Sequence, residues 1–198
     1  GGCTEPTLTL LRDMYAFGTS MPLTGTLTLK GGTHTAKNVT VAENANVTFA
    51  SGIYAGATID GTATVKEGVT FTDSTVTVNG TLNVEGGTFT GNVKFNGSSI
   101  ANISGGSFTN DKSYEGVEFD YNVTGTISGG TFAFADFYTT KVKLSGGTFT
   151  TIKTNGDRKL ADLLAEGAAY YRTVDDQAVT DDRVGSLENV KVVSHTHN

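Results

Sequence analysis

The chain has 198 residues, a formal net charge of −6 and a pI near 5.0. The chain contains 26 Gly, no Trp, many Thr and Val, and only 17% charged residues. This composition is typical of β-strands joined by turns and not of a disordered chain. The acidic balance argues against a nucleic-acid partner, the lone Cys3 excludes an internal disulfide framework, and no apolar run approaches the ~18 residues that membrane insertion requires.

The first expected element is a short capping helix over residues 6–17. Apolar residues stand at Leu8, Leu11 and Tyr15, and Pro6 suits a first helical turn. The alternating Thr-Leu-Thr-Leu at 7–10 also fits a first strand, so both readings stay open. Residues 1–22 are assigned to an N-terminal cap.

A repeat dominates residues 23–153. The segment S-G-G-T-F-T at 145–150 recurs in close variants, and the first glycine of each pair falls at 31, 86, 105, 129 and 146. The intervals of 55, 19, 24 and 17 residues suggest a unit of about eighteen, and a degenerate copy, K-E-G-V-T-F-T at 66–72, lies inside the longest one. Fixed-period similarity of this kind is typical of a solenoid.

Aligned copies show what each position does. An inward apolar column precedes the glycine pair, and a second column consists of His34, Phe71, Phe89, Phe108, Phe132 and Phe149. Phe89 lies an odd number of positions after the inward Val84, so the glycine pair between them must turn a corner, where Gly accepts positive φ. A third short strand, such as 93–95, leads into an Asn-Gly turn, so three strands and three corners make one coil.

Two all-β folds fit short strands of this kind. Asn-Gly turns also signal hairpins, as in an antiparallel barrel. Antiparallel neighbours need not resemble each other, however, whereas coils stacked in register place like residues above like. We therefore predict an all-β fold, a single-stranded right-handed parallel β-helix, or solenoid, with short helical caps.

One interval departs from the period. The step from Gly105 to Gly129 is longer than its neighbours, and loop insertions in solenoids often bind ligands. Tyr and Phe beside acids suit a protein or sugar contact, although these aromatic side chains also suit packing of the loop onto the coil. The predicted partner-binding residues are Tyr114, Glu118, Tyr121, Asp136, Phe137 and Tyr138, with Glu115 in the same loop.

Residues 154–198 are assigned to a C-terminal cap that leads to a linker. A helix is predicted over 157–166, because Leu160, Leu163 and Leu164 share one face, Asp157 can cap it and Gly167 stops it. Two strands, at 168–174 and 187–193, are expected to follow as a hairpin or as edge strands.

We find little pattern for catalysis or cofactors. A catalytic pair of carboxylates on adjacent coils would appear as a column of acids in the aligned repeats. Only Glu67 and Glu85 approach this pattern, and the simplest interpretation is that both are solvated corner residues. His34 is interpreted as a residue at the edge of the core. His195 and His197 supply only two ligands, which is too few to indicate a metal site. The prediction is no enzyme, no cofactor and no metal.

The G-G-T-F repeats, the segment L-A-D-L-L-A-E-G-A-A-Y-Y and the closing V-K-V-V-S-H-T-H-N resemble repeat modules of large cell-surface proteins of Gram-positive gut bacteria. The resemblance implies a secreted, wall-attached protein that binds host or dietary ligands, in some cases immunoglobulin variable domains in the manner of a superantigen. No residue motif in this chain can be matched to immunoglobulin binding.

Three functions therefore remain open. The leading expectation is a monomeric, non-catalytic adhesin module whose partner is a host protein, such as immunoglobulin or a mucosal glycoprotein. The second is a carbohydrate-binding or glycan-active β-helix, and the third is a passive stalk.

Overall fold

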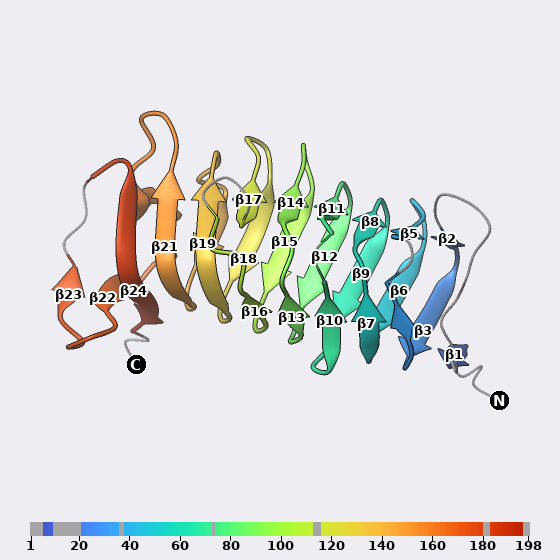
Figure 1. The fold of residues 1–198 in the computed structure, drawn as a ribbon. Coiled ribbons are helices and arrows are strands. Elements are labelled where there is room, and N and C mark those ends of the chain that lie inside the picture. Colours follow the sequence, from blue (N-terminus) through green and yellow to red (C-terminus); the bar gives the residue numbers. More distant parts are fainter. Residues whose placement is uncertain are drawn as a thin grey trace.

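The structure is a computed structural model of the chain and describes residues 6–9, 21–35, 38–72, 74–112, 116–179 and 183–195. Within these ranges the protein is all-β, with one 3-10 turn and no α-helix. The chain winds around a three-sided coil, and successive coils stack along one axis from the blue strands to the red strands of Figure 1.

Face A is a parallel sheet of eight strands, each paired with its equivalent one coil away. Its strands are β1 (Thr7–Thr9), β3 (Thr26–Lys30), β6 (Asn46–Phe49), β9 (Thr62–Val65), β12 (Thr81–Val84), β15 (Ile100–Ile103), β18 (Thr124–Ile127) and β20 (Val142–Leu144). About seven turns of a parallel β-solenoid result, which confirms the predicted fold class; the right-handed sense stays a prediction.

Faces B and C belong to one continuous sheet, because two long strands run around the corner between them. Face B holds β4 (Thr33–His34), β7 (Gly52–Tyr54), β10 (Val69–Phe71), β13 (Thr88–Phe89), β16 (Ser107–Phe108) and the first residues of β19 (Thr131–Phe137) and β21 (Thr148–Thr154). Face C holds β2 (Met21–Leu23), β5 (Val39–Val41), β8 (Ala57–Ile59), β11 (Val76–Val78), β14 (Val93–Phe95), β17 (Val117–Phe119) and the last residues of β19 and β21.

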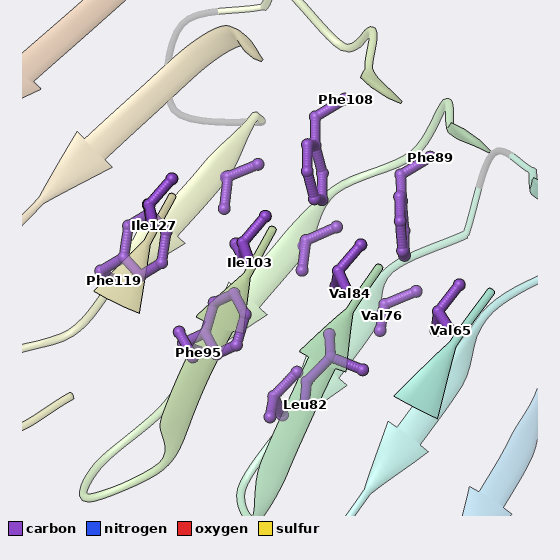
Figure 2. Close-up of a cluster of buried hydrophobic side chains, with 14 of the residues drawn as sticks. Val65, Val76, Leu82, Val84, Phe89, Phe95, Ile103, Phe108, Phe119 and Ile127 are labelled. Carbon is purple, nitrogen blue, oxygen red and sulfur yellow. The ribbon is translucent and has the colours of Figure 1, made fainter. Parts of the chain in front are cut away.

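The predicted phenylalanine column coincides with the strand register of face B. Phe71, Phe89, Phe108, Phe132 and Phe149 pair in succession, and each is at most 4% exposed. Successive ring centroids lie 4.7 to 5.3 Å apart, with interplanar angles of 18° or less. Figure 2 shows two of these rings lying face to face above the inward valines of face A. The aromatic stack is therefore as regular as the backbone ladder.

A second stack lies inside face C, beneath the turns that lead back to face A. The rings of Phe95 and Phe119 lie 5.0 Å apart, and those of Phe119 and Phe137 lie 4.4 Å apart. All three side chains are fully buried. Each coil in this part of the solenoid thus contributes two stacked rings to the core.

One coil has no recognisable repeat in the sequence. Tyr54 pairs with His34 on one side and Phe71 on the other, so S-G-I-Y at 51–54 is a further copy of the corner. Tyr54 is fully buried, its hydroxyl donates to the Ser51 carbonyl at 3.1 Å, and burial raises its pKa to about 12. Comparison of the repeat sequences does not detect this copy, because it has Tyr in place of Phe and only one glycine at the corner.

The glycine pairs at the corner between faces A and B are required by close packing of coils. A Cβ on Gly105 would lie 2.4 Å from the Glu85 carbonyl oxygen of the preceding coil. The next residue, Gly106, has φ +90°, where other residues are strained. The recurring pair is therefore explained by architecture alone.

Both predicted helical caps are wrong where the structure describes them. Residues 7–9 form β1, which pairs with β3, so the alternative reading as a first strand is confirmed; residues 10–17 lie outside the described ranges. At the other end only Leu160–Leu163 forms a 3-10 turn, η1. Leu160 and Leu163 are fully buried, and Leu164 forms a parallel bridge to Leu144, so the chain extends face A instead of continuing a helix.

Antiparallel strands cover the C-terminal edge of the solenoid. β24 (Ser186–Ser194) pairs with β21, β22 (Ala168–Arg172) pairs with β24, and β23 (Ala178–Val179) pairs with β22. The two predicted strands are confirmed as neighbours in this cap. Such a cover protects backbone groups that an open parallel edge would leave unpaired.

The Phe stack gives a direct test of the register. Phe108→Ala is expected to lower the free energy of unfolding by ~3–5 kcal/mol, because it leaves a cavity between two stacked rings. Thr131→Ala, at an exposed position beside the stack, should stay within ~0.5 kcal/mol of the parent. Chemical denaturation of both variants measures the difference, and equal stability of the Phe108 variant and the parent would show that the stack is not internal.

Candidate functional site

Two predicted partner-binding residues meet at the corner between faces C and A. Tyr121 follows β17 and Tyr138 follows β19, so they stand on consecutive coils where earlier coils have Asn-Gly turns. Their ring centroids lie 5.4 Å apart at 56°. Tyr121 is 58% exposed, which makes it the most exposed aromatic side chain among the large hydrophobic residues that the structure places at the surface.

Arg158 extends this pair onto the next coil. Its guanidinium carbon lies 5.3 Å from the Tyr121 ring centroid, within the range of a cation–π contact. Its Nη1 donates to the Asn155 carbonyl at 2.7 Å, which ties the side chain to the turn after β21. We call Tyr121, Tyr138 and Arg158 the Tyr–Arg cluster. Arg158 is absent from the predicted site residues because the sequence pattern indicates a helix over 157–166.

A row of four charged residues crosses face C beside the cluster. Lys94, Glu118, Asp136 and Lys153 are partners in successive strand pairs, so their side chains stand side by side. The Lys94 ammonium lies 3.1 Å from a Glu118 carboxylate oxygen, and the Lys153 ammonium lies 3.5 Å from an Asp136 carboxylate oxygen. The two central carboxylates thus each have a basic neighbour on their outer side.

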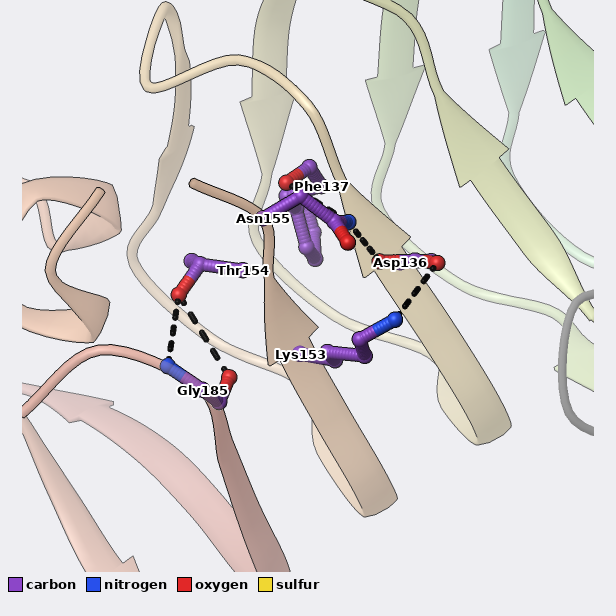
Figure 3. Close-up of polar contacts among 6 residues, drawn as sticks. All are labelled: Asp136, Phe137, Lys153, Thr154, Asn155 and Gly185. Atoms are coloured by element: carbon purple, nitrogen blue, oxygen red, sulfur yellow. Dashed lines mark hydrogen bonds and ion pairs between the residues drawn. The ribbon is translucent and has the colours of Figure 1, made fainter. Parts of the chain in front are cut away.

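Asp136 is the most enclosed member of this row, at 2% exposed, so its prediction as a partner contact is corrected. Asn155 donates its side-chain amide to one carboxylate oxygen, and Lys153 approaches the other, as Figure 3 shows. Burial raises the pKa of Asp136, and the Asn155 and Lys153 contacts partly offset this effect. Asn155 also accepts the Arg158 hydrogen bond, so Asp136 positions the turn that carries the arginine.

The remaining predicted residues divide between surface and core. Glu118 is half-buried in the charged row. Phe137 lies in the core on the ring of Phe119, so its prediction as a partner contact is corrected: the side chain points inward, as the alternation of β19 requires. Tyr114 and Glu115 lie outside the described residues.

The candidate acids of the glycine corner are not partners across the ladder. The Glu85 carboxylate forms an ion pair with Lys66, its neighbour across the ladder, while Glu67 packs against Gly86.

His34 is buried beside Tyr54, as predicted for a core-edge residue. His195 contacts the Tyr171 hydroxyl at 2.6 Å, and His197 lies outside the described residues. In the ranges that the structure describes, no three metal-binding side chains gather.

Compared with known proteins, the chain matches no family model, no curated protein and no solved structure. Over the described part of the chain, no helix has the length and apolar character needed to cross a membrane.

Asp136→Asn tests the effect of burial through its pH dependence. Because the folded-state pKa is raised, the folded protein holds a proton on Asp136 more tightly than the unfolded chain does. The contribution of Asp136 to stability is then most favourable below the ordinary pKa of 3.8 and falls as pH rises through the folded-state value. We expect the stability difference, wild type minus variant, to become less favourable between about pH 3 and pH 7.

Chemical denaturation of both proteins across this range measures that difference, and subtraction cancels the carboxylates that they share. A difference that grows more favourable with rising pH would mean that Lys153 and Asn155 outweigh burial.

Proposed function

We propose that the chain is a non-catalytic binding module of a bacterial cell-surface protein and that the Tyr–Arg cluster is its contact with a host protein. The observation that carries the proposal is the cluster itself: two tyrosines and an arginine from three successive coils, with Tyr121 58% exposed. Tyr and Arg are enriched among residues that dominate binding energy at protein interfaces. Tyr also supplies a large contact area at small cost in side-chain entropy.

The setting of the cluster supports a preformed contact surface. Arg158 is held over Tyr121 by the Asn155 carbonyl, and Asn155 is held by the buried Asp136. Side chains ordered before binding lose less conformational entropy when the complex forms. A rigid solenoid edge of this kind suits a folded partner. Immunoglobulin variable domains are the proposed partner, on the strength of the family resemblance.

The absence of catalysis is part of the same proposal. The carboxylates that the sequence offers on adjacent coils have basic neighbours: Glu85 has Lys66, Glu118 has Lys94 and Asp136 has Lys153. Each of these ion pairs joins neighbouring coils, which gives the three carboxylates a structural role.

Binding to immunoglobulin Fab fragments tests the proposal. We expect Tyr121→Ala and Tyr138→Ala each to weaken Fab binding at least tenfold, which corresponds to about 1.4 kcal/mol, with Tm within a few degrees of the parent. Tyr171→Ala, in the C-terminal cap, is the matched control and should bind normally. Surface plasmon resonance with immobilised Fab measures the affinities. A parent that binds no Fab, or cluster variants that bind normally, would overturn the assignment.

The proposed lack of catalysis has its own assay. Incubation with pectins, alginates and mucin glycans should release no new reducing ends. The variant Glu67→Gln with Glu85→Gln should bind Fab like the parent, because both residues lie at the glycine corner and outside the Tyr–Arg cluster. Turnover by the parent that disappears in this double variant would contradict a purely binding role.

A further inference from the structure

An open groove follows the corner between faces A and B, away from the Tyr–Arg cluster. Its first part, about 440 Å³, is lined by Glu67, Glu85 and glycines of three successive corners. Its second part, about 380 Å³, is lined by residues of β16, β19 and β21 and by Thr109 just after β16. Ser107 lines both parts, so the two adjoin at this residue and together extend over five coils. At ~4.8 Å per coil the groove is about 19 Å long.

The groove exists because the corner must be made of glycine. Close packing against the preceding coil leaves no room for a Cβ at Gly86 or Gly105, and Gly87 and Gly106 have positive φ. The corner therefore has no side chains of its own, and side chains stand only on its two sides. Because the underlying rings of Phe108 and Phe132 are stacked and buried, the floor of the groove is rigid.

Hydroxyl groups repeat along the groove at the spacing of the coils. Thr88, Ser107, Thr131 and Thr148 are partners in successive strand pairs and form one row. Two residues further along, Thr90, Thr109 and Thr150 add hydroxyls on three coils, and Ala133 takes the equivalent place on the coil of β19. The hydroxyls of Thr90 and Thr109 donate to carbonyls of the preceding coil, which orients their oxygen lone pairs as acceptors.

These features select a ligand class. A ligand that uses the whole groove must be extended, must repeat near ~4.8 Å and must offer hydroxyl groups as both donors and acceptors. An extended chain of β-linked hexoses meets these conditions, because its rings repeat at a similar spacing. Among the described residues that line the groove there are two carboxylates and no basic side chain, so a neutral chain is favoured over a uronate or sulfated one.

We propose that this groove binds a neutral, linear β-linked polysaccharide that lies along the solenoid axis. The site is separate from the Tyr–Arg cluster and adds a second class of ligand to the module. The open ends of the groove admit internal segments of a long chain, so binding does not depend on a free chain end. Successive coils each add a hydroxyl from the row of Thr88, Ser107, Thr131 and Thr148, so affinity is expected to increase with the number of coils occupied.

Affinity electrophoresis in gels that contain mixed-linkage β-glucan, glucomannan or polygalacturonate tests the proposal. The parent should be retarded by at least one of the two neutral polysaccharides and not by polygalacturonate. Thr131→Arg with Thr148→Arg places two long side chains in the groove at exposed positions and should reduce retardation at least tenfold. The matched control, Thr124→Arg with Thr126→Arg, adds the same charges at exposed positions of face A and should migrate like the parent.

Several outcomes would refute the groove as a glycan site without refuting the proposed Fab contact. A parent that neither neutral polysaccharide retards, retardation by polygalacturonate alone, or equal loss in groove and control variants would each refute the groove as the binding site. Tyr121→Ala should retain glycan binding, and the groove variant should retain Fab binding. Failure of one proposal is therefore visible without failure of the other.

Discussion

Register between stacked coils is the constraint on which the rest of this molecule depends. Each inward position sits directly above its equivalent, and in the Phe column this brings rings to 4.7 to 5.3 Å from one another. This distance is close to the ~4.8 Å between paired strands, so the rings stack without bending the backbone. A slip of one residue would turn every inward side chain outward. The aromatic stacks therefore hold the coils to one register.

The same constraint explains which positions repeat and which vary. Inward residues and corner glycines touch the coil before and the coil after, so they are restricted on both sides. Outward residues also meet their equivalents on adjacent coils, as Lys94 meets Glu118, but most of them keep one side open to solvent. On face C the outward row runs Thr58, Thr77, Lys94, Glu118 and Asp136, so polarity and charge change, whereas the inward column of Ile59, Val78, Phe95, Phe119 and Phe137 stays apolar throughout. Function is expected where substitution costs least, at outward positions and at the turns.

How far the sequence predicts the structure follows from this difference. The inward columns and the corner were predictable because packing forces the letters to repeat. Tyr54 was missed because it fills the Phe column with another aromatic residue and its corner has lost one glycine. Phe137 was misassigned because the repeat does not show that β19 runs through the corner without a glycine turn, which places its ring inside face C.

The C-terminal cap was mispredicted for a different physical reason. Leucines at 160, 163 and 164 fit one face of a helix, but the same spacing fits a 3-10 turn followed by an extended bridge. At the end of the solenoid, Leu144 forms a parallel bridge with Leu164. Burial of Leu160 and Leu163 over the last coil outweighs the local propensity of this segment for a helix. Arg158 lies between β21 and η1, and the turn there brings its guanidinium over the ring of Tyr121.

The two proposed surfaces lie at different corners of one rigid cross-section, and this arrangement has an energetic consequence. Thr131 begins β19 and Tyr138 follows it, and the stacked rings of Phe132 and Phe137 lie inside the coil between them. A substitution that leaves these rings in place leaves the register unchanged. Effects at separated sites with no shared contact are expected to add. A solenoid of this kind can thus change what it binds at one corner while the other corner and the core remain as they are.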